Sequence, residues 1–236
     1  MDKLLGKNIL VTGATSGIGK ALVEKLFERG ANVAFCGRSE FKLNKLISEI
    51  AGIDKGYFEA FDISNESKII SFVASVYEKL GTIDILVNCA GANTAKANVA
   101  DIQTSDLEWM IKVNMVAPFI FMKEVYQRVQ NQESALFINI LSTVCNFSNE
   151  GIGAYTASKA GFDALLKVFR KEVRQKNVRV CSIYPGGVNT PFRNADKPAY
   201  LSPQSVADAI ISMMQYDDNT SIDELVIRPL IEKNYW

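Results

Sequence analysis

The chain has 236 residues, of which 48% are apolar and 22% charged, with 26 basic and 26 acidic side chains and no histidine. This length suits one α/β domain with a well-buried core, and no apolar run approaches the roughly 18 residues that a membrane-spanning helix needs. Balanced charge provides no field for nucleic acid or anionic lipid, and the missing histidine excludes a Ser-His-Asp triad and every His-containing metal site.

The N-terminal residues and the cysteines indicate a reducing compartment. The first apolar stretch stops at Gly13, too early for the apolar centre of a signal peptide, so we expect a cytoplasmic protein. Cys36, Cys89, Cys145 and Cys181 are widely spaced with no Cys-x-x-Cys pair. We therefore expect reduced cysteines that pack in the core, and no metal site.

Short β-branched runs alternate with segments of helical periodicity along the whole chain. Strands are predicted at 7–12, 32–36, 56–60, 83–87, 134–140, 178–184 and 224–227. Helices are predicted at 17–29, 40–51, 66–80, 104–130, 154–176 and 203–215. This alternation predicts an α/β, doubly wound Rossmann fold, with a seven-stranded, mainly parallel sheet and helices on both faces. No repeat or linker divides it, so residues 1–236 are interpreted as one domain, with a loop at 186–202 that shapes a ligand site.

A glycine-rich turn follows the first strand directly: Thr12-Gly13-Ala14-Thr15-Ser16-Gly17-Ile18-Gly19. Gly13 permits a tight turn, Gly17 lets the backbone approach a pyrophosphate, and Gly19 lets the next helix lie close to the strand. The N–H groups at the start of that helix then face the anion. Strand, turn and helix occur in the required order, which favours a dinucleotide site over a turn that merely ends a strand.

The end of the second strand indicates which dinucleotide binds. No acidic residue stands there to hold a ribose 2′-hydroxyl; Arg38 and Ser39 offer a planar donor group and a hydroxyl suited to a 2′-phosphate. We therefore predict NADP(H) rather than NAD(H), with a solvated surface role for Arg38 as the alternative.

Tyr155 and Lys159 are four residues apart on a predicted helix, so their side chains share one face. A tyrosine normally titrates near pKa ~10, and a neighbouring ammonium favours the phenolate, which makes Tyr155 usable as a general acid or base. Ser142 ends the fifth strand, where its hydroxyl can hold a substrate oxygen. A tyrosine and lysine at this spacing are otherwise more often a surface pair, and it is this context that favours catalysis.

With these motifs the chain resembles a short-chain dehydrogenase/reductase over essentially its whole length. The family's Thr-Gly-x-x-x-Gly-x-Gly matches Thr12 to Gly19, and its Tyr-x-x-x-Lys matches Tyr155 to Lys159. Its Asn-Asn-Ala-Gly is similar to Asn88-Cys89-Ala90-Gly91, in which Cys89 departs from the pattern and puts one structural hydrogen bond in doubt.

The resemblance implies roles for individual residues. The positions that match the family's catalytic residues are Asn114, Ser142, Tyr155 and Lys159. Cofactor binding falls on Gly13, Thr15, Ser16, Gly17, Ile18, Gly19, Arg38, Ser39, Asp62, Ile63, Asn88, Ala90, Gly91, Tyr155, Lys159, Pro185, Gly186, Val188 and Thr190. In the family, the residue at Lys159 also binds the nicotinamide ribose, that at Thr190 contacts the carboxamide, and that at Asn114 anchors a proton-relaying water. Pro118 lacks the N–H that would bond the carbonyl of Asn114, which leaves that carbonyl free for water.

The sequence thus predicts an NADP(H)-dependent oxidoreductase that moves a hydride to or from a small or medium carbonyl or alcohol substrate. Alternatives are an NAD-linked alcohol dehydrogenase, a 3-oxoacyl reductase, for which no basic cluster marks a carrier partner, and a nicotinamide-binding regulator without activity. Substrate contacts are expected at Ser142, Cys145, Phe147, Tyr155 and Phe192, with Asn93, Thr143 and Tyr184 as further candidates. The family also implies a homodimer or homotetramer built on the helices at 104–130 and 154–176, where apolar residues occupy more than one face.

Overall fold

The computed structural model describes residues 2–130, 132–192 and 196–233. Seven strands form one sheet in the order β3-β2-β1-β4-β5-β6-β7, and every strand pair in the described residues is parallel. The strands are β1 (Asn8–Thr12), β2 (Asn32–Gly37), β3 (Tyr57–Ala60), β4 (Ile85–Asn88), β5 (Ala135–Ile140), β6 (Val178–Pro185) and β7 (Glu224–Ile227). The predicted doubly wound fold is confirmed, and each strand lies within two residues of its predicted range.

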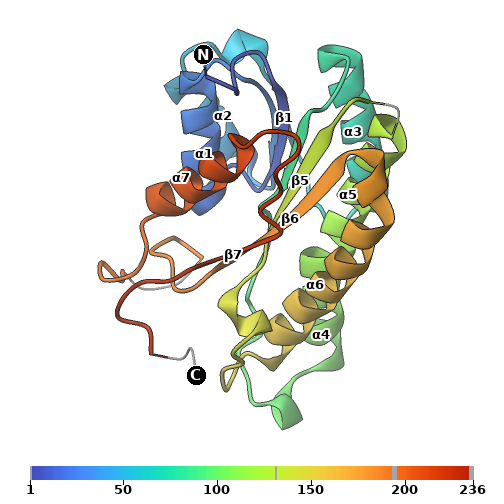
Figure 1. Cartoon of the computed structure of the whole chain (residues 1–236). Coiled ribbons are helices and arrows are strands. Elements are labelled where there is room, and N and C mark those ends of the chain that lie inside the picture. Colours follow the sequence, from blue (N-terminus) through green and yellow to red (C-terminus); the bar gives the residue numbers. More distant parts are fainter. Residues whose placement is uncertain (1, 131, 193–195, 234–236) are drawn as a thin grey trace.

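Helices cover both faces of the sheet (Figure 1). On one face lie α1 (Gly17–Glu28), α2 (Glu40–Glu49) and α7 (Pro203–Met214). On the other lie α3 (Glu66–Leu80), α4 (Thr104–Ile111), α5 (Ala117–Val129) and α6 (Gly153–Val173). No described helix is long and apolar enough to cross a membrane.

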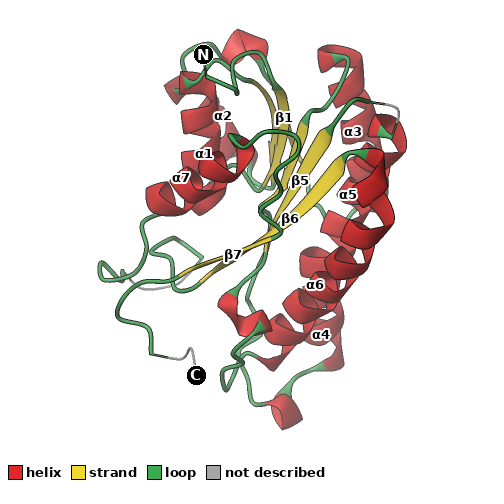
Figure 2. Cartoon of the chain, in the orientation of Figure 1, coloured by secondary structure: helices red, strands yellow, loops and turns green. Residues whose placement is uncertain are grey.

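Two large apolar layers form most of the core, one on each face of the sheet. Figure 2 shows the strands in yellow between the helices in red. Successive strand residues enter opposite layers, so Ile9 and Val11 pack with α1 and α7 whereas Leu10 packs with α3 and α5. Strands buried on both faces have near-continuous apolar sequences, as in β1 and β5, where every residue is buried. Strand order reverses between β1 and β4, which is where such sheets bind ligands.

One predicted helix, 104–130, is not a continuous α-helix. A π-helical turn at Lys112–Val116 separates α4 from α5, and Pro118 is the second residue of α5. Because proline cannot donate to the carbonyl four residues earlier, the regular hydrogen-bond pattern fails at this point and the chain accommodates a wider turn. Asn114 lies in the middle of that turn.

Candidate active site

A cavity of about 1060 Å³ opens at the carboxyl ends of the strands. Its walls come from the segments that follow β1, β2, β3, β4, β5 and β6, which the parallel sheet brings to a single edge. This is the expected place for a ligand in a doubly wound fold.

The glycine-rich turn after β1 forms one wall of this cavity. Gly13 and Gly17 have φ of +70° and +54°, and a Cβ on Gly13 would lie 2.7 Å from the Cα of Ala90. The Thr12 hydroxyl oxygen accepts the N–H groups of Cys89 and Ala90, both at 3.1 Å. The turn after β1 and the segment after β4 are therefore fixed against each other.

The start of α1 faces the cavity with free donor capacity. Ser16 is the N-cap in an extended conformation, and its side chain makes no capping hydrogen bond within the described part of the chain. Gly17, Ile18 and Gly19 line the cavity, so their N–H groups are placed to bind an anion. A Cβ on Gly37 would overlap the side chain of Thr15, which shows how closely the backbone closes around this space. These residues fit the pyrophosphate of a dinucleotide.

Two cations from the segment after β2 line the same cavity. Arg38 and Lys42 are exposed and line it, together with Ser39 and Asp62. The Ser39 hydroxyl oxygen caps α2 by accepting the N–H of Lys42 at 3.3 Å, which leaves the hydroxyl hydrogen available to a ligand. The sequence prediction missed Lys42 because only the helical turn after Ser39 brings it back to the cavity.

Lys159 is a buried ammonium that reaches the end of β5. Its Nζ donates to the carbonyl oxygen of Ile140 at 2.8 Å, and the residue is 5% exposed. Burial lowers the pKa of Lys159 from 10.5 to about 8. The space beside it exists because residue 91 is glycine: a Cβ there would lie 3.3 Å from Nζ of Lys159 and 3.0 Å from Oδ1 of Asn114.

Asn114 is fully buried, and hydrogen bonds occupy its side chain on both sides. Its amide nitrogen donates to the carbonyl of Ala92 at 2.8 Å and to the Ser158 hydroxyl at 3.1 Å, and its oxygen accepts the N–H of Ala92 at 2.9 Å. Asn114 thus ties the segment after β4 to α6, the helix that carries Lys159. That its main-chain carbonyl anchors a water stays a prediction.

Ser142 and Tyr155 lie on the cavity wall with Lys159. Ser142 begins a short 3-10 helix and accepts the N–H of Val144 at 3.3 Å, so its hydroxyl hydrogen remains available to a substrate oxygen. Tyr155 is 8% exposed and its ring packs on Phe192 with 6.0 Å between centroids. Nearby, the side-chain oxygen of Asn93 is buried without a hydrogen-bond partner in the described residues, as expected for a group that meets a ligand.

A family model described as short chain dehydrogenase matches residues 7–200. The chain belongs to this family. An uncharacterized oxidoreductase of Staphylococcus saprophyticus is 32% identical over 235 residues, covering 98% of this chain and 100% of the relative. One of Staphylococcus haemolyticus is 28% identical with the same coverage of both proteins.

Solved structures of similar fold cover nearly the whole chain. An alcohol dehydrogenase of Thermococcus sibiricus complexed with 5-hydroxy-NADP has a TM-score of 0.88 at 22% identity, covering 98% of this chain and 99% of that one. A metagenomic short-chain oxidoreductase in complex with NADP has a TM-score of 0.86 at 29% identity, covering 97% and 99%. This short-chain dehydrogenase is therefore an oxidoreductase of CH–OH or C=O groups that uses a nicotinamide cofactor.

Most of the predicted cofactor residues line the cavity, but some predicted site residues of this short-chain dehydrogenase do not. Asn88 is buried beneath the wall, where its amide donates to Asn139 at 3.0 Å and to the Pro118 carbonyl at 3.3 Å. Cys145 and Phe147 are not among the lining residues of the described chain. Positions 193–195 of the predicted 186–202 loop lie outside the described residues.

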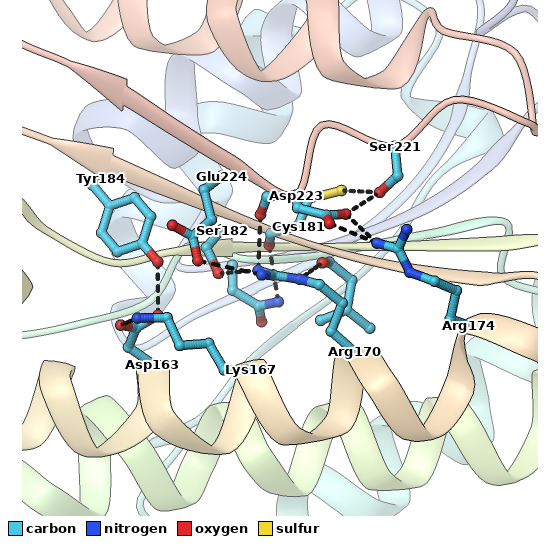
Figure 3. A network of polar contacts seen from close by, with 12 residues as sticks. Asp163, Lys167, Arg170, Arg174, Cys181, Ser182, Tyr184, Ser221, Asp223 and Glu224 are labelled. Atoms are coloured by element: carbon cyan, nitrogen blue, oxygen red, sulfur yellow. Dashed lines mark hydrogen bonds and ion pairs between the residues drawn. The ribbon is translucent and has the colours of Figure 1, made fainter.

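Tyr184 does not face the cavity, contrary to the sequence prediction. It is 1% exposed, and its hydroxyl donates to Asp163 at 2.7 Å, with Lys167 on the same carboxylate at 2.7 Å (Figure 3). Arg170 continues this network by donating to the carbonyls of Val180 and Asp223, which fixes α6 to β6 and β7. Tyr184 points to the α6 face because side chains alternate along β6.

Several further residues that line the cavity were not predicted individually. They are Lys96, Trp109, Asn149, Glu150, Ile152, Tyr200, Ile231, Glu232 and Lys233. Apart from Trp109, which lies on α4, these residues come from loops and from the C-terminal segment, which carry no motif or periodicity, so no local signal in the sequence could identify them.

Proposed function

We propose that the protein is an NADP(H)-dependent reductase of a small or medium carbonyl compound, or oxidises the corresponding alcohol, with Tyr155 as the proton donor or acceptor. The observation that carries this proposal is that Ser142, Tyr155 and Lys159 line the same cavity as a glycine-rich turn that fits a pyrophosphate. When bound, the nicotinamide supplies or accepts the hydride.

The protein's own groups handle the oxygen and the proton. The Ser142 hydroxyl donates a hydrogen bond to the substrate oxygen, and Tyr155 delivers its phenolic proton to that oxygen as the alcohol forms. Lys159, held by the Ile140 carbonyl, is mostly protonated at neutral pH because its pKa is about 8. Its positive charge stabilises the phenolate that Tyr155 becomes.

Exchange of Tyr155 for phenylalanine tests this proposal. NADPH oxidation by the wild type over a panel of ketones and aldehydes identifies a substrate, and Tyr155→Phe is expected to lower its turnover by about 10²-fold or more while NADPH affinity is retained. Tyr126→Phe on α5 is the matched control, since Tyr126 packs on Phe169 outside the cavity lining. Undiminished turnover in Tyr155→Phe would refute the mechanism.

The preference for NADP(H) rests on Arg38 and Lys42, two cations on the same cavity wall near the start of α2. Single exchanges for alanine are expected to raise the KM for NADPH by roughly 5- to 10-fold each, with little effect on NADH, because each removes a charged hydrogen bond to the 2′-phosphate. Equal effects on both cofactors would favour the NAD-linked alternative. Binding of NADPH without turnover on any compound of the panel would favour a regulator.

A homodimer or homotetramer built on α5 and α6 is supported by their exposed apolar side chains. Val116, just before α5, and Phe119 on it are 38% and 39% exposed, and Leu165 and Val168 on α6 are 36% and 56% exposed. Light scattering measures the oligomeric state directly.

A further inference from the structure

We infer that Glu232 and Arg228, beyond the last strand, are positioning residues that hold the backbone turn at Pro185–Gly187 in the shape required on the nicotinamide side of the site. This inference rests on the proposed function for its role in the reaction. The restraint on the turn itself is expected in the protein before any cofactor binds.

The carboxylate of Glu232 lies directly against the turn. Its Oε1 accepts the N–H of Gly187 at 2.6 Å, and a Cβ on Gly186 would overlap its Oε2. Oε2 is also 3.4 Å from Nη1 of Arg228. A hydrogen bond from a backbone N–H to a charged acceptor is stronger than one between neutral groups, so this contact restrains the turn effectively.

Arg228 connects the same carboxylate to the loop after β5. Its guanidinium lies over the ring of Phe147, 4.8 Å from the centroid, and Phe147 is five residues beyond Ser142. The Arg228 and Glu232 side chains are only 15% and 16% exposed, so water weakens their attraction less than it weakens that of a surface pair. The pair thus joins the loop that bears Ser142 to the turn that ends β6.

Two consecutive glycines explain why the turn needs an external restraint. Gly186 and Gly187 have no side chains that could pack and fix their conformation. On the side of Gly187 where a Cβ would project, the ring of Tyr200 occupies the space, and Glu232 binds its N–H. The turn is held from outside by residues that are distant in the sequence.

A shift of this turn would affect one half of the cavity. Thr190, three residues after Gly187, packs over the start of α1: a Cβ on Gly17 would lie 3.1 Å from its methyl group. Arg38 and Lys42 belong to the segment after β2, and no hydrogen bond or ion pair among the described residues joins them to Glu232 or Arg228. Loss of Glu232 should therefore weaken binding of the nicotinamide half and spare the adenosine half.

The first test needs no cofactor. Amide hydrogen exchange of the segment 186–190 is measured in the wild type, Glu232→Ala and Glu232→Gln. Glu232→Ala is expected to exchange at Gly187 roughly 10-fold faster, and Glu232→Gln less so, because the glutamine oxygen still accepts the N–H. Unchanged exchange at Gly187 in Glu232→Ala would overturn the inference whatever reaction the protein catalyses.

The second test separates the two halves of the cofactor by calorimetry. In Glu232→Ala, the Kd of NADPH is expected to rise roughly 5- to 10-fold while that of 2′,5′-ADP stays within about 2-fold, with Glu232→Gln partly rescued and Arg228→Ala intermediate. Asp208→Ala breaks an ion pair with Lys25, and neither residue lines the cavity, so both values should stay unchanged. Parallel weakening of NADPH and 2′,5′-ADP would indicate general destabilisation and overturn the inference. If the protein reduced no carbonyl compound, the proposed function would be refuted, but both measurements would still test the role of Glu232.

Discussion

Replacing Lys159 with methionine should yield a protein that is more stable and far less active. The ammonium is buried, and its pKa falls from 10.5 to about 8 because burial disfavours the charged form. At 1.36 kcal/mol per pH unit this difference costs the folded protein roughly 3 kcal/mol when the lysine is charged. Methionine keeps a similar length and removes the charge, but it also loses the hydrogen bond to Ile140, worth about 1 to 2 kcal/mol.

The expected net result is a gain of about 1 to 2 kcal/mol in the free energy of unfolding of Lys159→Met at pH 7. The pH dependence gives a sharper signature. Between pH 8 and 10.5 the unfolded chain holds a proton on Lys159 that the folded protein has released, so wild-type stability rises with pH by up to about 1.4 kcal/mol per unit from this group. Lys159→Met lacks that contribution, so its gain in free energy of unfolding over the wild type should become smaller between pH 8 and 10.5.

Urea denaturation of both proteins at half-unit steps from pH 6.5 to 9.5 measures the effect, with equal m-values required in each pair. Groups remote from Lys159 titrate alike in the two proteins and cancel in the difference. The reasoning would be refuted if the free energies of unfolding of the two proteins changed in parallel with pH, or if the variant were less stable than the wild type at pH 7. Turnover on the best substrate should fall by about 10²-fold or more, because nothing then stabilises the phenolate of Tyr155.

Three further substitutions test other parts of the structure. Gly13→Ala places a Cβ 2.7 Å from Cα of Ala90 at a φ of +70°. Thermal unfolding should therefore show a loss of about 1 to 3 kcal/mol in the free energy of unfolding, and calorimetry should show weaker NADPH binding. Wild-type values for both would contradict the close packing of the turn. Pro118→Ala restores an N–H beside the π-helical turn and is expected to lower turnover with little change in NADPH affinity, whereas unchanged turnover would remove the argument for a freed Asn114 carbonyl. Val168→Asp puts a charge on an exposed apolar site of α6, and light scattering should then find a lower mass, closer to that of a monomer. An unchanged mass would show that α6 does not form the interface.

The features predicted well from the sequence are those that short segments encode. The glycine-rich turn, the Tyr155–Lys159 spacing and the alternation of strand and helix each depend on neighbouring residues, so they could be recognised without tertiary structure. Pro118 even marked where the helix at 104–130 departs from α-geometry, although the π-helical turn itself was not predicted. The tertiary structure also decides that the Asn114 side chain bonds to Ala92 and Ser158.

Loop and strand-end orientations were predicted less well, because they follow from packing. The sequence predicts Tyr184 as a pocket residue, but the sheet turns it towards Asp163 on α6, where a buried carboxylate accepts a hydrogen bond from its hydroxyl. Phe147 follows Ser142 closely and still lies under Arg228 and off the cavity wall.

By itself, the sequence determined the glycine-rich turn and the Tyr155–Lys159 spacing, since each is contained in fewer than ten consecutive residues, and it determined the sheet through the alternation of strand and helix along the chain. Only the tertiary structure decided how the site is completed: it buries Lys159 and lowers its pKa, and it places Glu232 on Gly187 from 45 residues away. Such long-range contacts form when the parallel strands bring their carboxyl ends to one edge, and no local pattern of residues records them.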